Sequence, residues 1–119
     1  VLVLGGMNPG QSTNAVAAIM AEMMGAELLV NLSDVEGIYD RDPKDPNAKL
    51  LDRISSGDLM EMIVEKESKA GSYELFDLVA LKILMRSKIP MIFTDGRDKG
   101  KVYLALKGRE VGTLVYHDE

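Results

Sequence analysis

The chain begins VLVLGGMNPGQSTNAVAAIMAEMMGAELLVNLS (residues 1–33), and this stretch decides the fold. Residues 1–4 are an unbroken apolar run, which is typical of a strand buried on both faces of a parallel sheet. Residues 13–24 are apolar at nearly every position and predict a buried helix, and Gly25 suits the left-handed position that follows a helix end. Residues 27–33 predict the next strand. Strand, helix and strand so close together form a β-α-β unit, whose two strands must be parallel.

The alternation of strands and helices continues along the chain. Residues 34–51 are rich in Asp, Gly, Asn and Pro, and they predict an irregular excursion with a short hairpin around Gly37. The remaining pattern predicts a helix over 57–66 capped by Ser55, Ser56 or Asp58, a helix over 74–87, a buried strand over 91–94 and a turn over 95–100. Residues 101–108 suit a short helix or a strand, of which we favour the helix, and residues 111–118 predict an edge strand or hairpin arm. We therefore expect an α/β protein with a mainly parallel sheet, forming one domain over residues 1–119.

The composition excludes several classes of protein. The 119 residues are 46% hydrophobic and 28% charged, which is enough for one packed domain. The absence of Cys and the single His, His117, argue against disulfides, zinc sites and His-driven catalytic triads. The net charge is −5 with scattered Lys and Arg, which does not indicate a nucleic-acid surface. No membrane helix or signal peptide is apparent. We expect a cytoplasmic protein that binds neither nucleic acid nor membrane, with no metal-ligating residues of its own.

The loop from Gly5 to Asn14 is the first candidate site. Glycine lets the backbone approach a ligand closely. Ser12 and Thr13 place hydroxyls at the start of the helix, where unpaired N–H groups and the helix dipole favour anions. The same residues also suit a tight turn with a Ser or Thr cap, and local features leave both interpretations open. Neither GxxxxGK[ST] nor GxGxxG occurs in the chain, so a phosphate site here is of another type.

The stretch LSDVEGIYDRDP (residues 32–43) is the second candidate site. It follows a predicted parallel strand, so it belongs at the carboxyl edge of the sheet, where α/β proteins bind ligands. Ser33, Tyr39 and Asp42 offer a hydroxyl, an aromatic face and a carboxylate that could cradle a nucleoside. The residues alone favour the other interpretation, a solvated acidic loop with a turn. Lys69, two residues before Gly71, could place an amine near a ligand, but a solvated lysine is the favoured interpretation.

Four stretches in this order resemble a known family. They are GGMNPGQSTNAVAAIMAE, LLVNLSDVEGIYDRDPKDPNAKLL, KAGSYELFDLVALKILMRSKIPMIF and KGREVGTLV, and they resemble the C-terminal half of archaeal-type uridylate kinases in the amino acid kinase superfamily. DVEGIYDRDP marks the superfamily, and NPGQST points to the uridylate branch. The resemblance implies a three-layer α/β/α sandwich, transfer of the γ-phosphoryl group of ATP to UMP to give UDP, the use of Mg²⁺, and a homohexamer.

The resemblance also assigns residues by matching position. It implies that ATP contacts Ser33, Tyr39 and Asp42, and that UMP contacts Met7, Asn8, Pro9, Gly10, Gln11, Ser12 and Thr13. No catalytic residue is assigned, because Asn14 stands where the family usually has an Asp that orients the active-site lysines. Asn keeps the shape of Asp but lacks the charge that holds an ammonium group.

The N-terminal half of the family has no counterpart in these residues, and the chain opens within a predicted strand. In the family that half carries a glycine-rich phosphate loop and a lysine that neutralises the transferring phosphate. Phosphoryl transfer depends on positioning and charge neutralisation, so we expect residues 1–119 alone to be inactive. Two alternatives stay open. One is a kinase-fold protein that binds a nucleotide or anion as a sensor or storage module. The other is a different superfamily member, because the absent half largely selects the acceptor.

Overall fold

The computed structural model describes residues 13–33, 35–41, 44–67 and 76–117. In chain order the elements are α1 (Thr13–Met24), β1 (Leu29–Ser33), β2 (Arg53–Ser55), α2 (Ser56–Glu67), α3 (Leu78–Ser87), β3 (Met91–Asp95), α4 (Lys99–Leu106) and β4 (Thr113–Tyr116). The strand expected over residues 1–4 lies outside the described residues. Within those ranges, every helix is too short or too polar to cross a bilayer.

The four described strands form one sheet in the order β1-β3-β4-β2. β1 is parallel to β3 and β2 is parallel to β4, whereas β3 and β4 are antiparallel. The expected mainly parallel sheet is therefore confirmed. The expectation of an edge strand or hairpin arm over 111–118 is wrong, because β4 lies between β3 and β2 and α4 separates it from β3 along the chain. The three-residue strand β2 was not predicted, since it is too short to show an alternating pattern.

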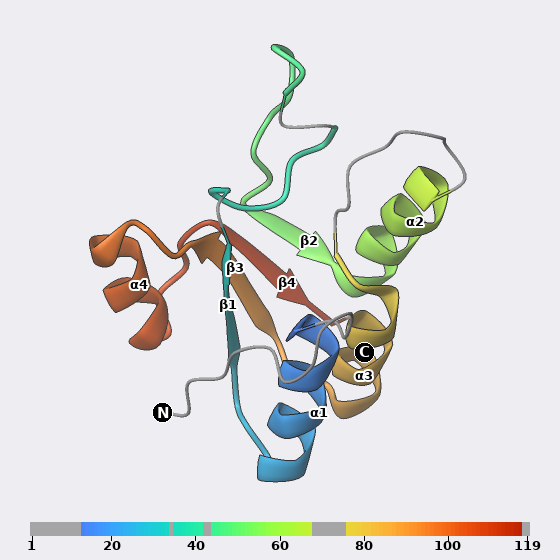
Figure 1. Ribbon diagram of the computed structural model, residues 1–119, viewed down its shortest axis with the longest axis vertical. Helices are drawn as coiled ribbons and strands as arrows, with labels where there is room; N and C mark the ends of the chain where they lie inside the picture. Colours follow the sequence, from blue (N-terminus) through green and yellow to red (C-terminus); the bar gives the residue numbers. More distant parts are fainter. Residues whose placement is uncertain (1–12, 34, 42–43, 68–75, 118–119) are drawn as a thin grey trace.

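Helices cover both faces of the sheet and make a three-layer α/β/α arrangement (Figure 1). α1, α2 and α3 lie on one face, and α4 lies on the other against β1 and β3. Side chains of β3 alternate between the two layers, as the pleat of a strand requires. Met91 and Phe93 belong to the large core under α3, while Ile92 is buried outside that cluster.

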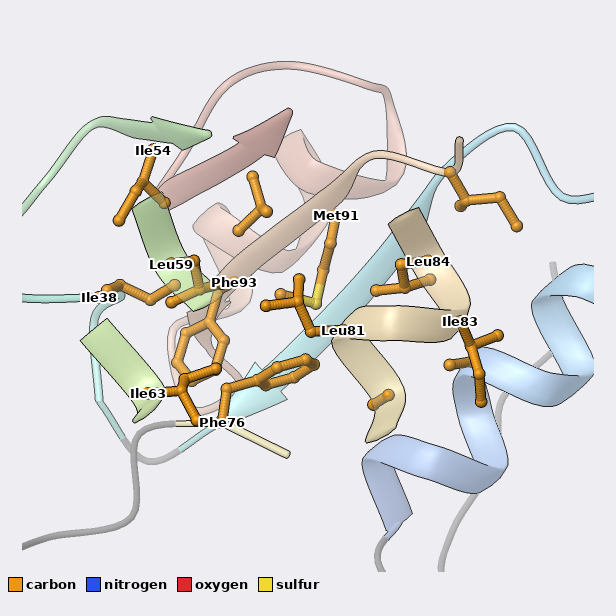
Figure 2. Packing of buried hydrophobic residues seen from close by; sticks show 14 of the residues in the cluster. Ile38, Ile54, Leu59, Ile63, Phe76, Leu81, Ile83, Leu84, Met91 and Phe93 are labelled. Atoms are coloured by element: carbon orange, nitrogen blue, oxygen red, sulfur yellow. The ribbon is translucent and has the colours of Figure 1, made fainter. Parts of the chain in front are cut away.

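The main core joins three helices, the sheet and the long loop after β1 (Figure 2). Phe76 meets Phe93 edge to face, with ring centroids 6.3 Å apart and ring planes at 73°, which is a favoured aromatic geometry. Ile38, from the loop, belongs to the same cluster as this pair (Figure 2). The fully buried large apolar side chains are Ile38, Leu59, Leu81, Leu84, Met91, Ile92 and Val115. The loop after β1 is therefore anchored in the same core as the helices.

Local capping explains where the helices begin and end. α1 has the predicted bounds, and Gly25 ends it at a φ of +65°. Ser55 is the cap of α2, because its Oγ accepts from the Asp58 N–H at 3.1 Å. α3 begins at Leu78 rather than at residue 74, because the extended Asp77 accepts from the N–H groups of Val79 and Ala80.

α4 confirms the predicted helix near the C-terminus but spans Lys99–Leu106, two residues earlier than expected. Asp98 sets its start by accepting from the Lys101 N–H at 3.1 Å. Gly108 follows its end with a φ of +78°, a conformation in which glycine carries no steric cost.

Candidate functional site

The carboxyl ends of β1 and β3 lie side by side and bring Ser33 opposite Asp95 in the sheet register. The Gly96 N–H donates to the Ser33 carbonyl at 2.8 Å, so the turn after β3 is tied to the end of β1. A Cβ at Gly96 would lie 2.9 Å from the Leu32 Cβ, which shows how closely the two strand ends approach. Ligands of parallel α/β sheets bind at such an edge.

Asp95 is fixed by its neighbour Arg97. Its Oδ1 accepts from the Arg97 N–H at 2.8 Å and from Nε at 3.0 Å, and its Oδ2 accepts from Nη2 at 3.0 Å. These hydrogen bonds, led by those from the Arg97 guanidinium, lower the pKa of Asp95 from its ordinary value. From the sequence, Asp95 is only the first residue of the turn predicted over 95–100. An Asp directly after a buried strand was the signal that could have placed it at the edge of this site.

The loop after β1 turns back on itself as a short antiparallel hairpin (Figure 1). Tyr39 pairs with Leu50 in an isolated antiparallel bridge, and the Asp40 N–H donates to the Lys49 carbonyl at 3.0 Å. The Asp45 carbonyl accepts from the Ala48 N–H at 3.0 Å at the tip. The predicted hairpin therefore exists, but its reversal lies at residues 45–48 and not around Gly37.

Gly37 has a packing role instead of a turning role. It is buried, and a Cβ there would lie 2.6 Å from the Thr113 Oγ1 and 2.9 Å from the Leu50 Cδ1. Only a residue without a side chain lets the loop come this close to the start of β4. The same loop carries Tyr39, whose side chain is half-buried.

The structure describes some of the predicted site residues and leaves others outside. Ser33 ends β1, and Tyr39 lies in the loop that continues from it, so both are on the carboxyl side of the sheet. Asn14 is the second residue of α1 and is half-buried, and Thr13 is the first. α1 runs opposite to β1, so its N-terminal end points to the same side as the carboxyl end of β1 (Figure 1). Outside the described residues lie Met7, Asn8, Pro9, Gly10, Gln11, Ser12, Asp42, Lys69 and Gly71.

The described side chains do not build a metal centre. In the described ranges no group of three or more His, Asp or Glu residues is placed to hold an ion. The single His, His117, has its Nε2 2.6 Å from the Ile89 carbonyl and links the residue after β4 to the segment between α3 and β3.

Fold, strand-end site and sequence together define the class of protein. The model of the amino acid kinase family matches residues 1–95, and the chain belongs to that family. Among its relatives, the uridylate kinase of Methanobrevibacter smithii is 42% identical over 116 residues, which are 97% of this chain and 52% of that protein. The uridylate kinase of Thermococcus sibiricus is 45% identical over 114 residues, 95% of this chain and 51% of that protein. The chain thus spans about half the length of these relatives.

Solved structures agree with this assignment. The crystal structure of uridylate kinase from Archaeoglobus fulgidus superposes with a TM-score of 0.77 at 37% identity, covering 93% of this chain and 50% of that one. UMP kinase from Bacillus anthracis has a TM-score of 0.74 at 21% identity, covering 94% of this chain and 43% of that one. The second likeness shows the fold alone, and both confirm the expected architecture.

Proposed function

We propose that this chain is the nucleotide-binding portion of a uridylate kinase, and that the complete protein transfers the γ-phosphoryl group of ATP to UMP to give UDP. The observation that carries the proposal is the pairing of two features on one side of the sheet. One is the N-terminal end of α1, and the other is the hairpin loop that leaves β1 at Ser33. The similarity to proteins named uridylate kinase along almost the whole chain supports this assignment.

In this proposal the two loops bind different nucleotides. Ser33, Tyr39 and Asp42 contact ATP, with the Ser33 hydroxyl as a polar contact and the Tyr39 ring as an apolar surface. The loop before α1 binds UMP through Met7, Asn8, Pro9, Gly10, Gln11, Ser12 and Thr13. The N–H groups of a helix N-terminus favour a phosphate at that position.

Mg²⁺ belongs to the proposed reaction as a companion of ATP. Proteins generally hold Mg²⁺ through one or two carboxylates together with the phosphates of the substrate, and it serves to neutralise phosphate charge. The described residues, which lack a cluster of carboxylates, fit that mode better than a metal site built from protein side chains alone. We further propose a cytoplasmic homo-oligomer, a hexamer by family resemblance, in which residues 1–119 form one domain.

The direct test is a phosphotransfer assay of the complete protein with ATP, Mg²⁺ and each nucleoside monophosphate in turn. We expect UMP to be the preferred acceptor by kcat/KM. Equal use of several monophosphates would contradict the assignment of UMP. Residues 1–119 expressed alone should show no transfer, because half the length of the relatives has no counterpart in them.

Asn14 favours a second candidate, a kinase-fold protein that binds a nucleotide without turning it over. It is half-buried near the start of α1, where the family resemblance places a carboxylate. Calorimetry with ATP and the assay of Asn14→Asp separate the two. If the complete protein binds ATP without transfer, and Asn14→Asp does not restore transfer, the sensor or storage function is the better assignment.

A further inference from the structure

One buried hydroxyl connects both arms of the loop that carries Tyr39. Thr113, the first residue of β4, is 0% exposed. Its Oγ1 accepts from the Ile38 N–H at 2.8 Å and donates to the Leu51 carbonyl at 2.5 Å. A hydroxyl can donate once and accept twice, so both bonds can exist together. A single side chain thus holds residues that are 75 and 62 positions away in the sequence.

The two hydrogen bonds of Thr113 Oγ1 lie directly next to the backbone bridge between Tyr39 and Leu50. Ile38 and Leu51 are hydrogen-bonded to each other, since the Leu51 N–H donates to the Ile38 carbonyl at 2.9 Å. Tyr39 and Leu50 are the next residues of the two arms, and they form the isolated bridge. The Thr113 hydroxyl therefore holds Ile38, the residue next to Tyr39, and in this way sets the position of Tyr39.

The backbone around Thr113 is shaped so that the loop can reach it. There is no room for a Cβ at Gly37, because it would lie 2.6 Å from the Thr113 Oγ1. Gly112 has a φ of +60°, and a Cβ there would lie 2.7 Å from the Glu36 carbonyl oxygen. On the loop side Ile38 is fully buried in the core. Three successive loop residues, 36 to 38, thus contact the start of β4.

We propose that Thr113 is a positioning residue for ATP, which acts by holding the Tyr39 hairpin against the sheet. The inference rests on the proposed function in one respect, because it takes Tyr39 as a contact of ATP. Removing the hydroxyl leaves the buried Ile38 N–H and the partly buried Leu51 carbonyl without this partner, and the hairpin then opens more often. Leaving a buried donor unpaired is costly, because water cannot replace the lost bond there.

The test is Thr113→Val in the complete protein, which keeps the branched shape and removes the hydroxyl. We expect the KM for ATP to rise about ten-fold, the order of effect of one unpaired buried donor, while the KM for UMP changes less than about two-fold. Amide hydrogen exchange of residues 36–51 should accelerate by a similar factor, with the helices unaffected. Thr113→Ser, which restores the hydroxyl, should recover both values.

Thr94→Val is the matched control. Thr94 is also a fully buried threonine of the same sheet, but its Oγ1 has no hydrogen-bond partner among the described residues. This variant should leave the KM for ATP and the exchange of residues 36–51 unchanged. If Thr113→Val does not fold, Gly37→Ala replaces it, because the added Cβ presses on the Thr113 Oγ1 and moves the same loop.

The outcomes separate the inference from the function on which it rests. A wild-type protein that does not bind ATP contradicts the proposed function, whatever happens to the loop. A loop that loosens in Thr113→Val without a change in the KM for ATP overturns the positioning role and leaves the function intact. Equal effects of Thr113→Val and Thr94→Val, or uniform acceleration of exchange, would show that Thr113 contributes only to global stability.

Discussion

Among the glycines that the structure describes, Gly112 has the least room for a side chain. Its φ is +60°, and a Cβ would lie 2.2 Å from the Phe93 carbonyl oxygen and 2.7 Å from that of Glu36. Gly112→Ala must therefore distort two backbone segments in addition to adopting a left-handed conformation. We expect a loss of about 3 kcal/mol or more in the free energy of unfolding, measured by urea denaturation.

Gly108 provides the control for that measurement. Its φ of +78° imposes a similar conformational cost, but a Cβ there meets nothing within 4 Å. Gly108→Ala should cost only about 1 kcal/mol, the penalty of the left-handed region for a residue with a side chain. Similar losses in the free energy of unfolding for the two variants would mean that the nearby carbonyl oxygens around Gly112 contribute little to the cost of adding a Cβ there.

Residues that belong to local motifs can be predicted from the sequence, whereas residues that act through contacts far along the chain cannot. Ser33 and Tyr39 were singled out because they belong to one compact motif after a strand, and their binding roles stay predictions. Gly37 was noticed for its freedom to turn, but its real constraint is the hydroxyl of Thr113, more than seventy positions away. Thr113 itself carried no signal in the sequence, since a contact of that range leaves no trace in local periodicity.

At the level of elements, the start of α3 depends on one carboxylate. Asp77 Oδ1 accepts from the Val79 N–H at 2.7 Å and from the Ala80 N–H at 3.3 Å. Asp77→Ala leaves these N–H groups without a side-chain partner and should cost about 1 kcal/mol of stability in a denaturant titration. Asp77→Asn keeps an acceptor oxygen and should lose much less. An equal loss for both variants would indicate that charge, and not capping, is what matters at this position.

The contact between α1 and α3 has a pH-sensitive component. Arg86 donates to Glu22 through Nε at 2.9 Å and through Nη2 at 2.6 Å, and Ser87 donates to the same carboxylate. The Arg86 hydrogen bonds are the main reason that the pKa of Glu22 is lowered. Because the folded pKa lies below the unfolded one, the stabilisation is fully present above the ordinary carboxyl pKa of about 4.3. It is lost as the pH falls through the folded value.

Glu22→Gln should therefore be less stable than the wild type near pH 7, and the difference should shrink as the pH falls below about 4. The midpoint of urea unfolding, measured from pH 7 to pH 2, provides the comparison. Glu61→Gln removes an exposed carboxylate from α2 and serves as the control. A difference between Glu22→Gln and wild type that does not depend on pH would contradict the role of the ionised pair.

Helices with a clear apolar pattern can be predicted from the sequence more accurately than short strands, or than elements whose bounds depend on contacts with distant parts of the chain. The bounds of α1 were correct because an almost wholly apolar run ends at a glycine. The helix predicted over 74–87 starts too early, because the apolar Phe76 fits the helical pattern. In the structure Phe76 is buried in the core and precedes the N-cap residue Asp77. β2 has only three residues and exists because β4 pairs with it, which is information that its own sequence does not contain.

For the whole molecule, the pattern of alternating elements predicted the class and the mainly parallel sheet, but not the order of the strands. β4 lies inside the described sheet because it pairs with β3 on one side and with β2 on the other, and the chain reaches it from β3 through α4, which packs on β3 and β1. Strand order is decided by which apolar faces fit together across the molecule, and local periodicity carries no information about that choice.

The shared core under α1, α2 and α3 leads to the last prediction, that residues 1–119 unfold in one cooperative step. One cluster contains side chains of α1, α2, α3, β3, β4 and the hairpin loop, so none of these elements is expected to lose its packing while the others keep theirs. The chain has no Trp and four Tyr, and Tyr39, Tyr103 and Tyr116 lie in the hairpin, α4 and β4. Tyrosine fluorescence therefore reports on the loop, on β4 and on the α4 layer, while far-UV circular dichroism reports mainly on α1 to α3. We expect both urea transitions to coincide. A tyrosine transition at lower urea would mean that the hairpin or the α4 layer unfolds separately, and residues 1–119 would then not behave as a single domain.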